Sequence, residues 1–320
     1  MRTQLPGRTT TPTIAGLRPF TEGDLEPLTH LLWEARACPP TIHPAPEDVI
    51  LRWKRRNIDP IYDVQVVDGP GGNLAAFVQT GLFKDGTPRL SFELAVHPGW
   101  RRRGIGSALF DTVLTRAHSL GVHNITTPVY SLPGAAHTDI ARWLKHRDFK
   151  SDHSYWQMRL DNIAQKAWPH WPEGIGVRRF TDMDRDPAIW ANLILRAFNE
   201  SANAVGVLAQ MREPGVSPDG YFFAVDLATG QDVGTSRARI DVIGGEQVGY
   251  IGTVGVLPEY RGRGIASALL MQTLEFLAGR GMAAATLFVE DHNHNARKLY
   301  DRLGWRYLYR TEHYWRRLIP

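Results

Sequence analysis

One stretch of the sequence occurs twice, and this repetition limits what the chain can fold into more than any other feature. Residues 96–110 read VHPGWRRRGIGSALF, and residues 256–270 read VLPEYRGRGIASALL. The same offset of 160 residues relates GLRPFTEGD, which begins at Gly16, to GVRRFTDMD, which begins at Gly176. A duplication of this length predicts two copies of a whole domain rather than the short units of a solenoid.

The segment between the two copies has the composition of a linker. Residues 161–174 read DNIAQKAWPHWPEG, with two prolines and little periodicity. We therefore expect a boundary near residue 165, which gives domains over 1–165 and 166–320. A chain of 320 residues with 43% hydrophobic residues is long enough for each domain to bury a core of its own.

Both copies show the same order of predicted elements, described here for the second. GVRRF from Gly176 predicts a strand, 186–200 predicts a helix, and three β-rich runs follow, with the turns TGQD and GGE between them. The remaining elements are a helix over 262–279, the strand AATLFVE, a helix over 294–303 and a final aromatic-rich strand. This order predicts the α/β class, with a mixed, mainly antiparallel sheet flanked by helices in each domain.

The repeated stretch lies where a strand runs into a helix. The first amide groups of a helix have no carbonyl partners and point outward at the positive end of its dipole. Gly262, Gly264 and Ala266 have little or no side chain, so these backbone amides could approach a phosphate closely. Two such stretches favour binding of an anion such as a pyrophosphate over two solvated turns.

Composition excludes several other classes. The formal charge of +4 is spread along the chain except at 52–56, 101–103 and 261–263, which argues against nucleic acid as a ligand. No apolar run approaches the roughly 20 residues that cross a bilayer, so we expect no membrane partner. The first 13 residues lack the apolar core of a secretory signal, so we expect a flexible arm and a cytoplasmic protein. Cys38 is the single cysteine, which excludes an internal disulfide and favours a buried small side chain.

The repeated motif resembles the acyl-CoA signature of the GCN5-related N-acetyltransferases (GNAT). The pattern Arg/Gln-x-x-Gly-x-Gly/Ala is met by Arg261, Gly264 and Ala266, and again from Arg101. The order of elements also matches that family in both halves. Within it, the tandem layout and the stretch LFVEDHNHNARKLYDRLGW resemble the mycothiol synthase-like two-domain acetyltransferases.

This resemblance implies acetyl-CoA or another acyl-CoA as co-substrate, bound by a strand end and the loop after it. In the family, the strand end pairs with the pantetheine arm through its backbone. In the second half the implied residues are Val254, Gly255, Val256, Arg261, Gly262, Arg263, Gly264, Ile265, Ala266 and Ser267. In the first half they are Leu94, Ala95, Val96, Arg101, Arg102, Arg103, Gly104, Ile105, Gly106 and Ser107.

The two halves differ where the family places its chemistry. Asn293 and Tyr300 fit an asparagine that contacts the cofactor and a tyrosine that protonates the departing CoA thiolate. At these places the first half has His137 and Leu144, and a leucine cannot donate a proton. We therefore expect the second half to be catalytic and the first to bind CoA without turnover.

The base and the acceptor are less defined by the sequence. Related enzymes often use a glutamate early on the fourth strand to deprotonate the acceptor, but Tyr250 occupies that place. Glu290 and Glu246 are the remaining candidates.

The segment 201–220 carries few charges, which favours a small-molecule amine over a lysine-rich protein tail. We expect no metal, since the two histidines in DHNHN at 291–295 lack a third ligand. A non-catalytic acyl-CoA-binding or sensing protein is the alternative, and Tyr300 favours the enzyme. The oligomeric state is not indicated.

Overall fold

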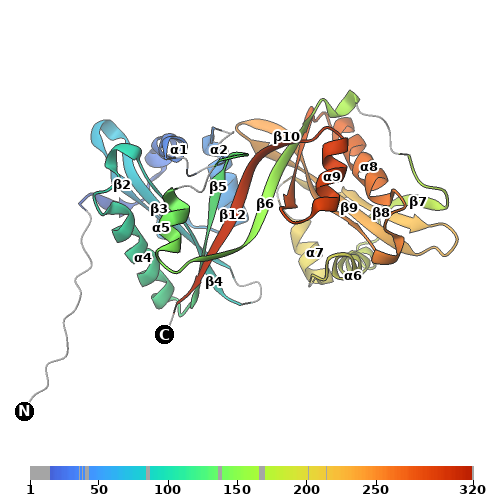
Figure 1. The fold of residues 1–320 in the computed structure, drawn as a ribbon, viewed down its shortest axis with the longest axis horizontal. Helices are drawn as coiled ribbons and strands as arrows, with labels where there is room; N and C mark the ends of the chain where they lie inside the picture. The colour runs from blue at the N-terminus through green and yellow to red at the C-terminus, as the bar shows by residue number, and fades with distance from the viewer. Residues whose placement is uncertain are drawn as a thin grey trace, which may run out of the picture. The chain divides into compact units, whose positions relative to one another are not determined.

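The computed structural model describes residues 15–35, 37, 39, 43–83, 87–135, 139–165, 170–200, 202–213 and 215–318, without the side chains of Arg55 and Asp152. It divides into two compact units (Figure 1). Unit 1 comprises 1–154 and 309–320, and unit 2 comprises 155–308.

In unit 1 the strands have the order β1-β2-β3-β4-β5-β12, and only β4 and β5 are parallel neighbours. The strands are β1 (Leu17–Pro19), β2 (Val64–Asp68), β3 (Leu74–Phe83), β4 (Arg89–Val96), β5 (Asn124–Ser131) and β12 (Arg306–Arg317). The helices are α1 (Leu25–Glu34), α2 (Pro46–Arg55), α3 (Pro60–Asp63), α4 (Ile105–Ser119) and α5 (Asp139–Lys145).

Unit 2 repeats this topology with the order β7-β8-β9-β10-β11-β6, and here β10 and β11 are the parallel pair. Its strands are β7 (Ile175–Arg179), β8 (Val216–Asp226), β9 (Asp232–Ile243), β10 (Glu246–Val256), β11 (Ala284–Glu290) and β6 (Lys150–Asp161). Its helices are α6 (Asp186–Phe198), α7 (Ala204–Gln210), α8 (Ile265–Gly279) and α9 (His294–Arg302).

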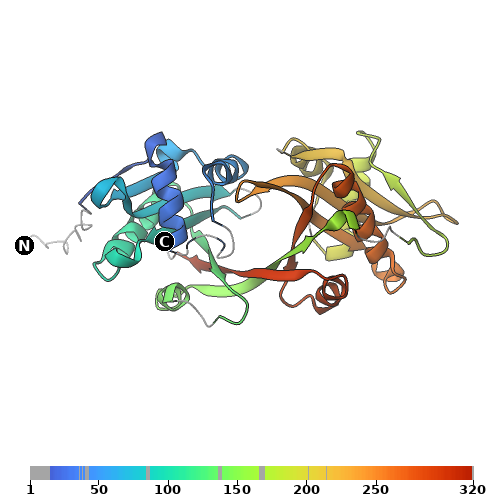
Figure 2. The ribbon, with the colours of Figure 1, turned by 90° about the horizontal axis from the view of Figure 1, so that it is seen from above.

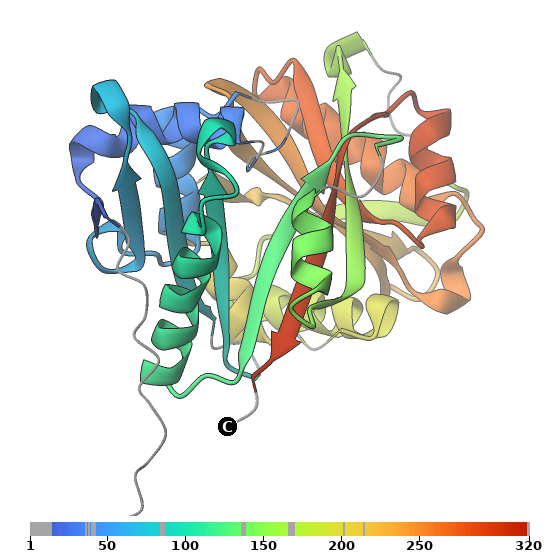
Figure 3. The ribbon, with the colours of Figure 1, turned by 60° about the vertical axis from the view of Figure 1, so that its left-hand side comes forward.

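The last strand of each sequence repeat completes the sheet of the other unit. Residues 155–161 of β6 pair with β11, although β6 belongs to the first repeat. Residues 310–317 of β12, from the second repeat, pair with β5, and Figure 3 shows the red β12 beside the green β5. The compact units therefore differ from the division at residue 165 that the sequence led us to expect, because the terminal strands are exchanged.

Alternating side chains give the sheet of unit 1 two covered faces. Phe77 and Val66 pack on one face against α1 and α2, whereas Val78 and Leu90 pack on the other with α4 and α5. Figure 2 shows the blue helices α1 and α2 on one side of this sheet and the teal α4 on the other. A strand covered on both faces buries its side chains at every position, as eight successive buried residues of β3 do.

In unit 2, β6, β10 and β11 present one apolar and one more polar face. Met158, Ile251 and Leu287 pack with α8 and α9 in a buried cluster. The residues of alternate parity on these strands include Tyr250, Thr286 and Arg159. The first face anchors the helices, and the second presents groups that can bind a ligand.

The predicted α/β class and the order of elements in the second half are confirmed. The helix expected over 262–279 begins at Ile265, because Gly262 and Gly264 adopt positive φ and keep the preceding residues out of the helix. The short helix α7 was not predicted. Within the described residues, no helix is long and apolar enough to cross a membrane, and no group of three or more metal-ligating side chains is found.

Candidate functional site

The two repeated loops have the same backbone conformation. Gly104 and Gly264 precede α4 and α8 with φ of +82° and +83°, and Arg102 and Gly262 also have positive φ. The first intrahelical bonds run from Ala108 and Ala268 to the carbonyls of these glycines. The amides of 105–107 and 265–267 therefore lack intrahelical partners and can donate to an anion.

The signature arginines brace these loops. Arg261 donates through Nε to the carbonyl of Val256 at 3.2 Å and through Nη2 to that of Ala197 at 2.7 Å. Arg101 makes the same two bonds in unit 1, to Val96 at 3.1 Å and Ala35 at 3.0 Å. Each arginine thus joins the strand end to the C-terminal end of the first helix of its unit, α1 or α6, and holds the loop in position.

In unit 2 the strands β10 and β11 separate after a short parallel pairing. The register pairs Gly249, Tyr250 and Ile251 with 285–287, and a bulge follows at 251–253. Beyond it, the segment from Val254 to Val256 has no ladder partner on the β11 side. Such a gap leaves backbone groups available to a ligand, as expected for this strand end.

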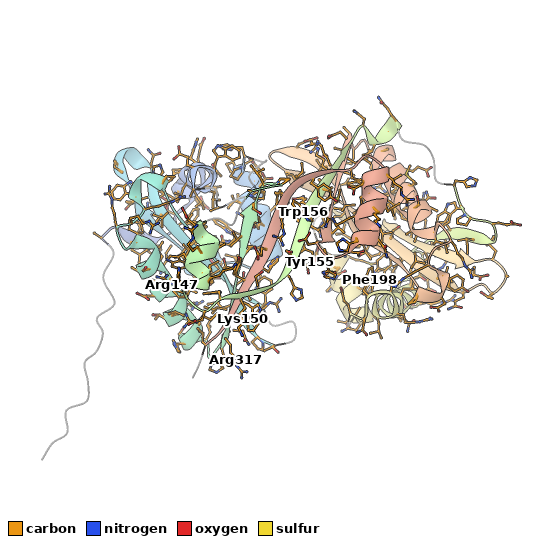
Figure 4. All side chains as sticks on the ribbon, viewed as in Figure 1. Arg147, Lys150, Tyr155, Trp156, Phe198 and Arg317 are labelled. Carbon is orange, nitrogen blue, oxygen red and sulfur yellow. The ribbon has the colours of Figure 1, made fainter. Side chains whose placement is uncertain are left out.

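Phe198 covers the same strand end from the last residue of α6 (Figure 4). Its ring lies 2.7 Å from the position that a Cβ atom on Gly255 would take. A side chain at this position would displace the ring, so glycine allows the close packing of Phe198 on this strand end.

Tyr300 lies on α9 and is 8% exposed, with its ring 5.8 Å from that of Trp305. Burial raises the pKa of Tyr300 to about 12, and the neighbouring Tyr250 adds to the rise. In the described part of the chain, no hydrogen bond engages the Tyr300 hydroxyl. The phenol therefore stays protonated at neutral pH and its proton remains available for donation.

The other residues expected near this gap do not all meet there. Asn293 caps α9, with Oδ1 accepting from the amide of Ala296 at 3.1 Å. Glu290, at the end of β11, has its carboxylate 3.0 Å from Nε2 of His292. Glu246 begins β10, at the opposite end of the parallel pair, and forms an ion pair with Arg159 at 2.9 Å. The two candidate carboxylates thus lie at opposite ends of the sheet.

In unit 1 the corresponding gap opens into a cavity of about 1030 Å³. Only Leu90 and Ser91 pair with β5, and β4 then diverges. The cavity is lined by residues 92–96 of β4, by residues 104–107 of the loop and helix α4, and by parts of β5 and α5. Leu144 also lines it and is 1% exposed, so an apolar side chain stands where unit 2 has Tyr300.

A buried ion pair crosses this gap on the side of α2. Glu93, on β4, is 5% exposed and accepts from Nη1 of Arg56, with Arg52 at 3.7 Å. Arg56 also contacts Tyr130 on β5, so it bridges the two diverging strands. Burial alone would raise the pKa of Glu93, but the two arginines outweigh it and hold the pKa below its usual range.

The sequence reasoning missed this ion pair. The available signal was a charged residue at an inward position of the strand LSFELAV, since a buried carboxylate needs a cationic partner. Two other residues considered from the sequence, Cys38 and His137, lie outside the described residues.

Comparison with known proteins shows the class to which this architecture belongs. The acetyltransferase (GNAT) family matches the chain twice, over 26–136 and 188–305. The chain is 31% identical over 223 residues to the mycothiol acetyltransferase of Thermobispora bispora, covering 67% of this chain and 72% of that protein. It is 29% identical over 285 residues to the mycothiol acetyltransferase of Actinosynnema mirum, covering 87% and 91%.

Solved structures share the fold over nearly the whole chain. A GCN5-related N-acetyltransferase from Sphaerobacter thermophilus superposes with a TM-score of 0.79 at 24% identity, covering 95% of this chain and 96% of that one. A tandem GNAT protein from the clavulanic acid biosynthesis pathway superposes with a TM-score of 0.70 at 21% identity, covering 95% and 98%.

The chain therefore belongs to the acetyltransferase (GNAT) family, with two such domains in tandem. It is an N-acetyltransferase, which transfers an acetyl group from acetyl-CoA to an amine, and it resembles the mycothiol acetyltransferases. The expected family and reaction are thus confirmed, and the alternative of a binding protein without activity is not favoured.

Proposed function

We propose that unit 2 performs the acetyl transfer and that unit 1 binds a CoA-type ligand without turnover. The observation that carries this proposal is Tyr300, a buried phenol that lies near Tyr250 of β10 and whose hydroxyl makes no hydrogen bond to the described residues. Unit 1 has the same loop and a cavity, but Leu144 provides no proton.

The residues of unit 2 fit acetyl-CoA, which would supply an activated acetyl thioester. Backbone groups of 254–256 can pair with its pantetheine arm, and the amides of 262–267 can receive the pyrophosphate at the start of α8. Asn293 supports the site as the cap that fixes the start of α9, the helix carrying Tyr300. No metal is needed for this assignment.

Tyr300 acts as the general acid in this proposal. Its hydroxyl holds a proton at neutral pH and gives it to the sulfur when the thioester bond breaks. The acceptor amine must lose a proton before it attacks. Between the two candidate carboxylates, the position of Glu290 on the strand bordering the gap favours it over Glu246.

The proposed acceptor is a small-molecule amine. Residues 202–213 follow α6 and carry two charged side chains, Arg212 and Glu213. Such a wall offers little to a strongly basic peptide, and the names of the relatives are consistent with a small acceptor. We place the reaction in the cytoplasm because acetyl-CoA is made and used inside cells.

In unit 1, the ion pair of Glu93 with Arg56 supports a role in binding alone. It spans the gap on the side from which an acceptor would approach, and separating its charges would leave a buried carboxylate unpaired. A ligand can therefore enter from the loop side while the opposite side stays closed.

Two measurements on the full chain test this function. Native mass spectrometry of the purified protein should show up to two bound CoA species per chain. Release of CoA thiol from acetyl-CoA should depend on an added small amine and should slow by about 10²–10⁴-fold in Tyr300→Phe. Turnover restricted to lysine-rich peptides would contradict the proposed acceptor.

A further inference from the structure

Arg237 lies against the point where β10 leaves β11 in unit 2. Its position on β9 is opposite Thr253, immediately after the bulge. Its Nη2 and Nε atoms lie 2.8 and 2.9 Å from where a Cβ atom on Gly252 would be. The guanidinium therefore occupies the space that a side chain at 252 would fill, directly beside the proposed reaction site.

The charge of Arg237 is not balanced by a carboxylate in the described part of the chain. Nη1 donates to the neutral amide oxygen of Gln210, and the guanidinium lies 5.9 Å from the ring centre of Tyr221. Arg239, two residues further on the same face, has both Asp241 at 3.0 Å and Glu213 at 3.4 Å. Arg239 is thus paired with carboxylates, whereas the positive charge of Arg237 is left without such a partner among the described residues.

We propose that Arg237 binds a carboxylate group of the acceptor, so that the substrate of unit 2 is a short amino acid or another amine with a nearby carboxylate. This inference rests on the proposed catalytic role of unit 2. A guanidinium offers parallel N–H donors that suit a carboxylate, and these bonds are strengthened by charge.

The spacing along β10 limits the size of this acceptor. Val254, the first residue of the cofactor-binding strand end, lies two residues beyond Gly252, or about 7 Å along an extended strand. A hydrogen bond between guanidinium and carboxylate takes up about 2.8 Å of this distance. The remainder suits one to three carbon atoms between the amine and the carboxylate.

The surroundings favour one negative charge over several. Glu213 and Asp241 both lie beside Arg239 on the same side of the sheet, where they would repel a phosphate or another multiply charged group. Tyr250 and Phe288, whose ring centres are 6.2 Å apart, offer a largely aromatic surface next to them. This combination suits a compact acceptor with a single carboxylate.

Steady-state kinetics of the full chain with matched acceptor pairs test the inference. The pairs are glycine with glycinamide, β-alanine with β-alaninamide, and γ-aminobutyrate with its amide. We expect kcat/KM for the acid of at least one pair to exceed that for its amide by roughly 10- to 100-fold. The ammonium group of an α-amino amide loses its proton more readily than that of the corresponding amino acid. Amine reactivity alone would therefore favour the amide.

Substitutions then connect this preference to the guanidinium. Arg237→Gln should reduce the acid-to-amide ratio to about one, mainly through KM for the acid, and Arg237→Lys should retain part of it. Arg280→Gln is the matched control. Arg280 lies at the end of α8, also over an aromatic ring at 4.9 Å, but it pairs with Asp219. The control should leave the ratio unchanged.

Equal or better use of the amides by the parent protein in every pair would overturn the inference, as would an equal loss for acid and amide in Arg237→Gln. Calorimetric titration of the same compounds into the CoA-saturated chain measures the preference without turnover. Acid-selective binding that Arg237→Gln removes would support the inference even if unit 2 proved inactive. Equal binding would overturn it and leave the proposed function intact.

Discussion

The two units share one topology and one loop conformation, but different residues surround the gap between the diverging strands in each unit. In unit 1 the gap opens into a cavity of about 1030 Å³ and is bridged by Glu93, Arg56 and Tyr130. In unit 2 the gap borders two phenols, Tyr250 and Tyr300, and Arg237, which pairs with no carboxylate among the described residues. Ligand binding and chemistry therefore depend on different parts of the same fold.

On the proposed assignment, one copy of a duplicated domain has lost turnover and kept ligand binding. The proposed cofactor recognition depends on the backbone of the loop, whose positive φ both units share. Proton transfer needs a particular side chain, and replacing a phenol by Leu144 removes it. A buried ion pair such as that of Glu93 can then occupy the space that an acceptor would use.

Removing β12 should have the largest effect, and it tests whether the first repeat can fold without the last strand of the second repeat. A chain ending at residue 308 lacks the strand that pairs with β5 and loses the fully buried Tyr314. We expect unit 1 to lose its fold while unit 2, which retains β6, keeps its own. Hydrogen exchange should show the amides of 124–131 unprotected and those of 284–290 still protected. The reverse pattern would contradict the strand exchange.

Tyr300→Phe addresses the chemical difference between the units. Loss of a general acid typically costs about 10²–10⁴-fold, so we expect kcat to fall by that factor while the affinity for acetyl-CoA changes only a few-fold. Tyr314→Phe in unit 1 is a matched control, because burial also raises the pKa of Tyr314 to about 12. Steady-state kinetics and a melting curve on both variants give the comparison. Parental turnover in Tyr300→Phe would remove the main reason for assigning catalysis to unit 2.

Valine at either loop glycine tests which loop serves turnover. Gly264 and Gly104 have φ of +83° and +82°, which a β-branched residue adopts only with strain. We expect Gly264→Val to lower kcat/KM for acetyl-CoA by about 100-fold, and Gly104→Val to reduce the number of CoA molecules bound with a smaller effect on turnover. If Gly104→Val alone abolished activity in a folded protein, the catalytic unit would be assigned wrongly.

Glu93→Gln should measure how much the ion pair across the gap of unit 1 contributes to the stability of that unit. Removing one partner of a buried ion pair typically costs about 3–5 kcal/mol, since the arginines are left unpaired. Because the folded protein holds the pKa of Glu93 below its usual range, this contribution exists above the unfolded pKa and is lost as pH falls through the folded value. Urea unfolding across acidic pH measures it. A variant as stable as the parent would show that the bridge does not hold the gap.

The smallest effect concerns a contact that both units share. Arg18 lowers the pKa of Asp24 to about 2 through a hydrogen bond, and Arg178 is placed alike against Asp186 in unit 2. Asp24→Asn should cost about 1–2 kcal/mol above pH 5, allowing for the partly exposed Arg18, and the difference should vanish as pH falls from about 4 to 2. Asp186→Asn should give a similar dependence of stability on pH. An unequal dependence would show that the two arginine–aspartate pairs contribute differently to stability.

Much of the fold could be predicted because its causes are local. The positive φ of Gly104 and Gly264 follows from residue type, and the strand and helix periods follow from the alternation of apolar side chains. The mutual approach of Tyr300 and Tyr250 was not predicted, because the two residues are 50 positions apart in the sequence. The strand LSFELAV gave a signal for a buried Glu93, but its partner Arg56 and the surroundings of Arg237 could not be located in advance, since both depend on neighbours from other strands and helices.

The sequence by itself determined the duplication, the order of elements, the two glycine-containing loops before α4 and α8, and the inequality between Tyr300 and Leu144, because all of these follow from residue type and spacing. Only the tertiary structure decided that each repeat gives its last strand to the other unit, because an edge of a sheet accepts any strand with suitable side chains and the linker does not fix the partner. It also decided that Arg56 pairs with Glu93 across one gap, whereas Arg237 beside the other has no carboxylate partner in the part of the chain that the structure describes. Charges separated along the chain compensate one another only where folding brings them together.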